Sequence, residues 1–187
     1  MNKYYRHKSA IIETEMIGQN TRIHAFVHIL NGATIGKNAN ICDFCFIENG
    51  VEIGNNVTIK CGVYLWDGII VEDNVMIGPA VVFTNDLYPR SKNKKFNKLT
   101  TRLKNGSSIG ANSTILPGII IGQHAMIGAG TVVTKNVPDY ALFYGSPGKT
   151  HGYICPCTRP IKLKKNIFNC DCGRKYKKFK FSVIEVL

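Results

Sequence analysis

The stretch that decides the fold is residues 17–59, "IGQNTRIHAFVHILNGATIGKNANICDFCFIENGVEIGNNVTI", in which an apolar residue returns at every sixth position. The series reads Ile11, Ile17, Ile23, Ile29, Ile35, Ile41, Ile47, Ile53, Ile59, Leu65, Val71, Ile77 and Phe83, and it returns at Ile109, Ile115, Ile121, Ile127 and Val133. A period of six matches neither the helical period of 3.6 nor the alternation of an ordinary strand. It is typical of a β-solenoid, in which short strands wind around a narrow apolar axis.

Glycines give the number of hexapeptides in each coil. Gly18, Gly36 and Gly54 follow an inward residue at intervals of 18, so three hexapeptides form one coil of triangular section. We expect these glycines to stack at one corner, where a positive φ angle favours glycine. Thirteen hexapeptides before a break and five after it predict an all-β protein, a parallel β-helix of about six coils.

The break lies between Phe83 and Ile109, which are 26 positions apart and therefore out of phase with a period of six. The sequence predicts a loop inserted over residues 84–108. Its cations are Arg90, Lys92, Lys94, Lys95, Lys98, Arg102 and Lys104, against the single acid Asp86. We interpret the later lysines as a solvated surface. Arg90, which lies close to Asn85, is a candidate for binding phosphate or carboxylate.

Asp67 and Asn85 are 18 residues apart, and each stands two places after an inward residue. They should therefore lie on one outer face of the solenoid, about one strand spacing apart. A carboxylate and a carboxamide in this arrangement suit the binding of an amine and the polarisation of a carbonyl group.

Composition limits the partners and the location of the chain. Its 187 residues carry 24 Lys and Arg against 12 Asp and Glu, a net charge of +12, which indicates anionic partners. The N-terminus lacks the apolar run of a signal peptide, and no stretch is long enough to span a membrane. We expect a cytoplasmic protein with a solenoid domain at 1–150 and a small cysteine-containing hairpin at 151–187.

The segments "IGQNTRI", "IGKNANI", "IGNNVTI" and "IGQHAMIGAGTVV" resemble the hexapeptide-repeat acyltransferases. That resemblance implies a left-handed prism and a homotrimer. The segments "VVFTNDLYPRS" and "GAGTVVTKNVPDYALFYGSPGK" are similar to bacterial N-acetyltransferases that act on the 3-amino group of UDP- or dTDP-linked sugars for surface polysaccharides such as lipopolysaccharide. The resemblance covers roughly residues 5–150.

The resemblance also implies the site residues. Asn85 and Asp86 match residues of the family's site, and Asp67 falls where the family has an acidic residue. His28 matches a histidine common in the family, which implies a contact with substrate or a place at the trimer seam; a plain surface role is equally open. We assign Asp67 to gripping the sugar amine and Asn85 to stabilising the oxyanion or positioning the amine. The family proposals for the final proton acceptor include the departing thiolate of coenzyme A. The base (uracil or thymine), the sugar stereochemistry and the group at C6 stay open, although the cationic excess of the loop favours a uronate.

Acetyl-CoA is the implied co-substrate, lying along a prism edge between subunits. The backbone amides of Gly128 and Ala129 are candidates for binding its pantetheine arm, and Lys135 and Lys149 for binding its phosphates. Lys149 ends the segment "GSPGK", which has Gly148 where the family more often has alanine.

The tail contains Cys155, Cys157, Cys170 and Cys172, two C-x-C pairs separated by twelve residues. Four thiols in two pairs suit tetrahedral zinc, although one intervening residue is fewer than the usual two. Relatives with similar hairpin tails favour structural zinc over free thiols.

Two other functions remain open from the sequence. One is an acyltransferase of the same fold that acts on another small amine or hydroxyl. The other is a non-catalytic basic scaffold that binds, for example, nucleic acid. The inserted loop beside Asn85 and Asp67 argues against the scaffold, and we expect no nucleic-acid partner.

Overall fold

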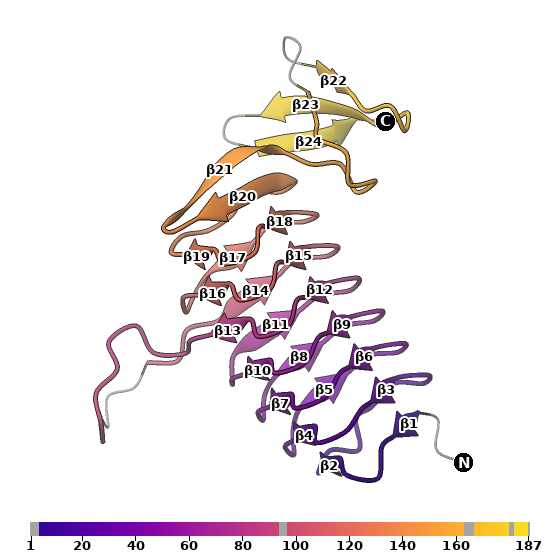
Figure 1. Ribbon diagram of the computed structural model, residues 1–187, viewed down its shortest axis with the longest axis vertical. Coiled ribbons are helices and arrows are strands. Elements are labelled where there is room, and N and C mark those ends of the chain that lie inside the picture. The colour runs from indigo at the N-terminus through magenta and orange to yellow at the C-terminus, as the bar shows by residue number, and fades with distance from the viewer. Residues whose placement is uncertain (1–3, 94–96, 163–166, 180–181, 187) are drawn as a thin grey trace.

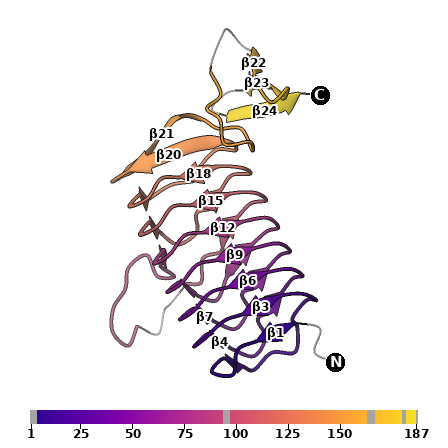
Figure 2. The same cartoon turned by 45° about the vertical axis from the view of Figure 1, so that its right-hand side comes forward.

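The computed structural model describes residues 4–93, 97–162, 167–179 and 182–186, and every regular element among them is a β-strand (Figure 1). No helix in these ranges could cross a membrane. Successive strands wind into a column with three walls, and a separate small sheet lies at its C-terminal end (Figures 1 and 2).

Each coil passes through the walls in the order first, second, third. The first wall is β1 (Tyr5–Arg6), β3 (Arg22–Ile23), β6 (Asn40–Ile41), β9 (Thr58–Ile59), β12 (Met76–Ile77), β15 (Ser108–Ile109), β18 (Met126–Ile127), β20 (Ala141–Gly145) and β21 (Gly148–Tyr153). The second wall is β2 (Ile11–Ile12), β4 (His28–Ile29), β7 (Phe46–Ile47), β10 (Tyr64–Leu65), β13 (Val82–Phe83), β16 (Thr114–Ile115) and β19 (Val132–Val133). The third wall is β5 (Thr34–Ile35), β8 (Glu52–Ile53), β11 (Ile69–Val71), β14 (Thr101–Leu103) and β17 (Ile120–Ile121).

Parallel pairing between residues 18 apart confirms three hexapeptides per coil, as between Arg22 and Asn40. The column has about eight turns rather than six, because the first wall runs from β1 to β20 in parallel register. The strands at both ends continue the winding where the apolar hexapeptide pattern has lapsed. β1, for example, pairs Arg6 with the inward Ile23 of β3, although Arg6 is not apolar.

The predicted inward residues form one continuous core. From Ile23 to Phe83 each member of the series is at most 4% exposed, as are the small residues Val27, Ala33 and Ala39 that precede them. The prediction that Ile11 points inward is wrong. Ile11 is 57% exposed and pairs with His28, whereas its neighbour Ile12 pairs with the buried Ile29. The phase therefore slips by one residue in the first coil.

Gly18, Gly36 and Gly54 do stack, but for a different reason from the one expected. Their φ angles are not positive; instead, a Cβ on Gly36 would lie 2.5 Å from the carbonyl carbon of Gly54. Close approach of successive backbones selects glycine here. The left-handed corner positions are occupied instead by residues such as Asn38 and Asn56, with φ of 56° each.

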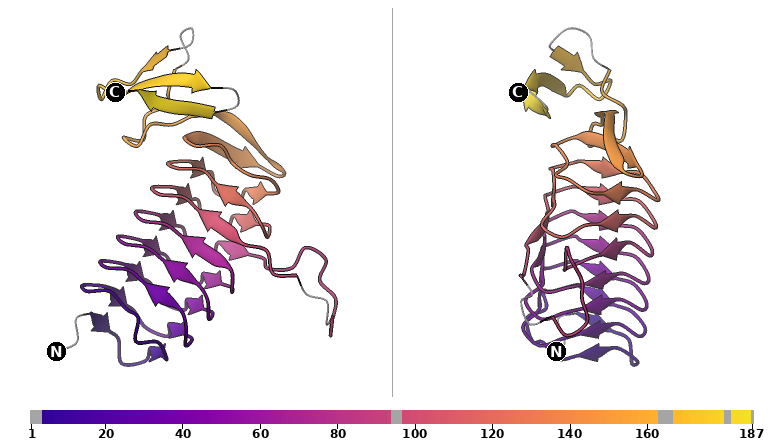
Figure 3. Two further views of the ribbon diagram at one scale, coloured as in Figure 1. Left: turned by 180° about the vertical axis from the view of Figure 1, so that it is seen from behind. Right: turned by 90° about the vertical axis from the view of Figure 1, so that its left-hand side faces the viewer.

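The inserted loop is shorter than the sequence predicts. Val71 of β11 pairs with Leu103 of β14, 32 residues away, where its other partner Ile53 is 18 away. The solenoid therefore resumes at Thr101 rather than at Ile109, and Leu103 is an inward residue that the hexapeptide reading omitted. The loop projects away from the column (Figure 3).

The tail is more than a hairpin. It contains an antiparallel sheet of β22 (Ile167–Asn169), β23 (Lys175–Phe179) and β24 (Ser182–Val186), with its own core around Phe168 and Tyr176. That core includes Tyr140 of the last coil, whose ring lies 5.3 Å from that of Tyr176. The tail therefore caps the open end of the column.

Candidate active site

Asp67 and Asn85 lie at the same corner of the column, between the second and third walls. They follow β10 and β13, which are paired neighbours in the second wall. The indole Nε1 of Trp66 donates a hydrogen bond of 2.8 Å to the carbonyl oxygen of Phe83 and so ties the two coils together at this point. Trp66 also packs against the core.

Asp67 is held through both its carboxylate and its backbone. The ammonium group of Lys98, from the returning arm of the loop, lies 3.2 and 3.1 Å from its two oxygens. The backbone N–H of Asp67 donates a hydrogen bond of 2.8 Å to Oε2 of Glu48, one coil below. The carboxylate lies against Gly50, where any Cβ would collide with it. A side chain at position 50 would therefore displace the acid, and the φ of 74° at this position also favours glycine.

Asn85 and Asp86 line an open recess of about 620 Å³ at the root of the loop, together with Pro89 and Arg90. The Asp86 carboxylate accepts a hydrogen bond of 2.9 Å from the backbone N–H of Tyr88, which shapes the first turn of the loop. Arg90 donates to the carbonyl oxygen of Pro89 and is exposed. Asp67 does not line this recess. It lies on the adjacent coil, because β10 pairs with β13, so Asp67 and the recess are neighbours at one corner.

His28 lies on the outer face of the second wall, half-buried, at a distance of 2.9 Å from the Glu13 carboxylate. This hydrogen bond lowers the pKa of Glu13. His28 also lines a groove of about 470 Å³ with a set of aromatic side chains from the lower coils.

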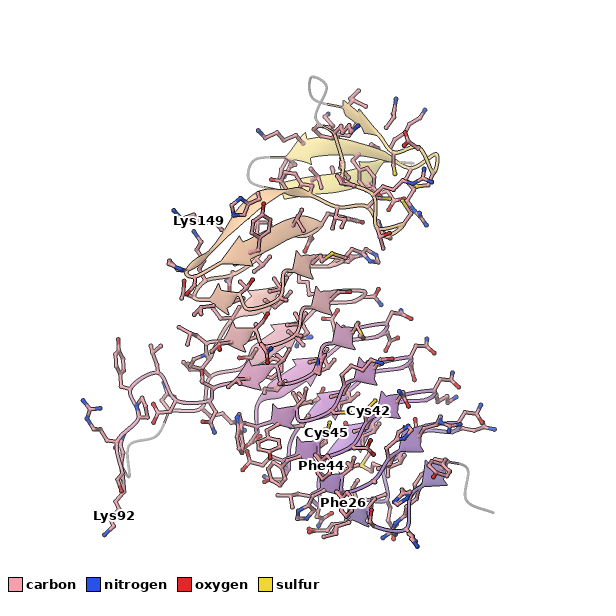
Figure 4. All side chains as sticks on the ribbon, viewed as in Figure 1. Phe26, Cys42, Phe44, Cys45, Lys92 and Lys149 are labelled. Atoms are coloured by element: carbon pink, nitrogen blue, oxygen red, sulfur yellow. The ribbon has the colours of Figure 1, made fainter. Side chains whose placement is uncertain are left out.

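The residues expected to bind coenzyme lie at the upper end of the column. Gly128 and Ala129 form the turn after β18, and Lys135 and Lys149 are exposed. Figure 4 shows Lys149 near the top of the molecule and Lys92 at the far end of the loop. The backbone N–H of Gly128 already donates a hydrogen bond to the carbonyl oxygen of Phe143 within the coil ladder, so this N–H is engaged within the fold.

The four tail cysteines come together although twelve residues separate the pairs. Their Sγ atoms all lie within 4.8 Å of one another, with 3.5 Å between Cys155 and Cys172 and 3.4 Å between Cys157 and Cys170. The Tyr176 hydroxyl donates a hydrogen bond of 2.9 Å to the Cys155 sulfur. Hydrogen bonds from the backbone of Arg174 and from neighbouring thiols lower the pKa of Cys172 to about 6.

Sequence reasoning missed two residues that contact Asp67. Lys98 was interpreted as a solvated lysine, because no spacing rule relates it to Asp67 across a 31-residue separation. Glu48 stands one place after the inward Ile47, and its proximity to Asp67 could have been found by continuing the coil-by-coil comparison from residue 67 to residues 48 and 49.

Comparisons with known proteins agree with this architecture. The sequence profile described as bacterial transferase hexapeptide (six repeats) matches residues 16–49 and 100–135. The chain is 59% identical over 171 residues to dTDP-3-amino-3,6-dideoxy-alpha-D-galactopyranose 3-N-acetyltransferase of Aneurinibacillus thermoaerophilus, an alignment that covers 91% of this chain and 89% of the relative.

Two solved structures share the fold. One is AntD, an N-acyltransferase from Bacillus cereus determined with dTDP and coenzyme A, with a TM-score of 0.55, 23% identity and coverage of 84% of this chain and 79% of AntD. The other is UDP-N-acetylglucosamine acyltransferase from Campylobacter jejuni, with a TM-score of 0.56, 14% identity and coverage of 82% and 74%. Together, the repeat, the inserted loop and the extended identity show that the chain belongs to the hexapeptide-repeat family of nucleotide-sugar N-acetyltransferases.

Proposed function

We propose that this enzyme transfers the acetyl group of acetyl-CoA to the 3-amino group of a dTDP-linked 3-amino-3,6-dideoxyhexose destined for a surface polysaccharide. The observation that carries the proposal is 59% identity over nine-tenths of the chain to an enzyme named for that reaction. The same name favours dTDP over UDP and a 6-deoxy sugar over a uronate. Arg90, at the root of the loop, is then suited to the diphosphate of the substrate.

Asp67 is the residue that we propose binds the acceptor amine. Its carboxylate already holds an ammonium group, that of Lys98, at 3.1 Å. The contact is about half exposed on the lysine side, so the pair is weak and exchangeable. An amino sugar entering the corner replaces Lys98 on the carboxylate, with its amine directed toward Asn85 on the next coil.

The reaction needs a neutral amine, so the ammonium form of the substrate first gives one proton to solvent, and it needs a stabilised oxyanion. The nitrogen lone pair attacks the thioester carbonyl carbon, the C–N bond forms, and the carbonyl π electrons move to oxygen. The Asn85 side-chain amide donates a hydrogen bond to that oxyanion; one such donor contributes about 3 kcal/mol. When the oxyanion collapses, the C–S bond breaks and the thiolate takes the proton that the nitrogen gives up.

Acetyl-CoA is proposed to reach this corner from the upper coils. Lys135 and Lys149 are exposed there and are suited to its phosphates. Ala129, on the exposed turn next to Gly128, is the remaining backbone candidate for the pantetheine arm.

The test is acetyl transfer to a panel of dTDP- and UDP-linked 3-amino sugars, measured by the release of free thiol. We expect turnover with a dTDP-3-amino-3,6-dideoxyhexose and a large loss in Asn85→Ala and Asp67→Ala. Full activity in both variants would remove the site assignment, and absence of turnover with every 3-amino sugar would remove the proposed function.

We also propose a cytoplasmic homotrimer in which neighbouring columns meet along their edges. The loop projects beyond the column and exposes large apolar side chains, with Tyr88 77% exposed, which a neighbouring copy would cover (Figure 3). Light scattering coupled to size exclusion should give three times the mass of the chain. A monomeric mass in active protein would refute this assembly.

The four-cysteine cluster is proposed to hold one structural zinc ion. Tetrahedral Zn–S bonds of about 2.3 Å place the sulfurs roughly 3.8 Å apart, close to the observed 3.4 and 3.5 Å and well beyond a disulfide bond of about 2.05 Å. Elemental analysis of protein purified without chelator should give one zinc per chain, and Cys155→Ser with Cys172→Ser should abolish it. A metal-free protein of unchanged thermal stability would overturn this assignment.

A further inference from the structure

The aromatic groove on the second wall crosses the lower coils and ends beside the candidate active site. It is lined by His28, Phe46 and Tyr64, which stack in register on β4, β7 and β10, and by Phe26, Phe44 and Trp66. Trp66 immediately precedes Asp67 in the chain. With a volume of about 470 Å³, the groove falls within the range of small-molecule sites.

Phe26 and Phe44 are placed at a cost to the fold. They occupy the corner between the first and second walls on successive coils, with φ of 57° and 60°, a backbone region that bulky residues seldom adopt. Their rings are 59% and 58% exposed, so neither contributes a buried side chain in return. The same corner holds Gly62 and Ala80 on the next two coils, which shows that the corner itself does not need an aromatic ring.

These two rings form the start of a stack that stops abruptly. Their centroids are 5.1 Å apart and their planes are within 12° of parallel, one above the other along the column (Figure 4). At the next coil the position belongs to Gly62, and a Cβ built there meets nothing within 4 Å. The step above Phe44 is therefore left open at Gly62, on the coil that carries Tyr64, and we call this opening the slot.

The slot lies within reach of the acceptor corner. Position 62 is five residues before Asp67, so at about 3.3 Å per residue the two positions are at most roughly 16 Å apart. An extended nucleoside diphosphate sugar spans this distance. With its amino sugar at Asp67, the substrate would cross Tyr64 and bring its base to the face of Phe44.

We propose that the groove is the nucleoside subsite and that the pyrimidine base of the acceptor stacks on Phe44 in the slot left by Gly62. This inference rests on the proposed function and specifies the half of the substrate that the catalytic corner does not contact. An aromatic lining also suits the methyl group of thymine. Burial of one methyl group corresponds to a preference of about four-fold for thymidine over uridine diphosphate.

The test uses calorimetric binding of dTDP, UDP and acetyl-CoA to the full-length protein, together with KM and kcat for the dTDP-amino sugar. Phe44→Ala removes the stacking face, and Gly62→Phe fills the slot with a ring that the backbone accepts at residues 26 and 44. Each variant should weaken dTDP binding by about ten-fold or more, as expected for the loss of base stacking, and raise KM with little change in kcat. Acetyl-CoA binding should not change.

Phe179→Ala is the matched control, because it removes an equally exposed phenyl ring, 57% exposed, from the distant tail sheet. It should leave dTDP binding unchanged. If wild-type enzyme acetylates the sugar but both groove variants bind dTDP normally, this inference is wrong and the proposed function stands. If the groove variants instead become monomers, the groove is a contact between copies and the inference is again wrong. If wild-type protein binds no dTDP and acetylates no sugar, both fail.

Discussion

Replacing Asp67 by asparagine removes the charge that we propose holds the acceptor amine while keeping the size of the side chain. In the structure the carboxylate makes two hydrogen bonds to one ammonium group, at 3.1 and 3.2 Å, and is one-third exposed. Hydrogen bonds to charged groups contribute about 1.5–3 kcal/mol each. Because the site is partly solvated, we take the effect of the whole contact as a single value in that range, which corresponds to roughly 10- to 150-fold in kcat/KM.

The partner variant has the opposite expected sign. Lys98→Ala removes the cation that competes with the substrate for Asp67. An exposed ion pair is worth roughly 0.2–1 kcal/mol, so KM for the amino sugar should fall by up to about five-fold. Both values come from initial rates at varied amino sugar with acetyl-CoA saturating. Lys92→Ala, at the far end of the loop (Figure 4), controls for the loss of one positive charge.

Two results would contradict this reasoning. If Asp67→Asn retains the wild-type kcat/KM, then Asp67 does not bind the amine. If Lys98→Ala raises KM as much as Asp67→Asn does, then Lys98 is part of the binding site rather than a competitor. Glu52→Gln, on the exposed face of the third wall, should leave kcat/KM unchanged and shows that the loss is specific to the corner.

Three further outcomes test the structure itself. Gly36→Ala places a Cβ 2.5 Å from the backbone of Gly54 and should lower the free energy of unfolding, measured in urea, by more than about 2 kcal/mol. The Cβ of Gly130→Ala meets no atom within 4 Å, so this variant should lose only the roughly 1–2 kcal/mol that a φ of 68° costs a residue other than glycine. Tyr176→Phe removes the hydrogen bond to Cys155 and should weaken zinc affinity by about 10- to 100-fold in a chelator titration. Burial lowers the pKa of His124. The stability that depends on its neutral form is therefore present above its ordinary pKa of about 6.5 and is lost as the pH falls through the lower folded value. In thermal melts, the melting temperature of His124→Gln should fall less in acid than that of the wild type.

The solenoid is predictable because each inward position is repeated many times and tolerates few exceptions. Ile59 and Ile77 are fully buried because a period of six brings both side chains to the axis of the column. Local breaks in the pattern are not predictable in the same way. Ile11 and Ile12 are adjacent isoleucines, and composition does not decide which one points inward; the register of β2 against β4 does. Leu103 stands six residues before Ile109 and is in phase with it, but it was missed because the count resumed only at Ile109.

The site could be predicted only as far as coil stacking reaches. A separation of 18 residues places Asp67 and Asn85 at one corner, and the structure agrees. The Lys98 contact depends on the path of the loop back to β14, and the aromatic groove depends on which outward residues stack. Phe26 and Phe44 are 18 residues apart, so their stacking follows from the period, but their left-handed backbone does not.

The tail shows how close spacing can still make a tetrahedral cluster. Each C-x-C pair lies in the same tight turn: the residue after the second cysteine, Thr158 or Gly173, donates its N–H to the carbonyl of the first cysteine and has φ of 70° or 91°. Two copies of one turn face each other, so each supplies two sulfurs to a shared centre. Because this centre contacts Tyr176, and Tyr176 packs on Tyr140 of the last coil, a metal held there fixes the tail against the end of the column. The end of a solenoid is otherwise an open sheet edge prone to pairing with other chains, so the metal that we propose would protect the enzyme at a point far from its chemistry.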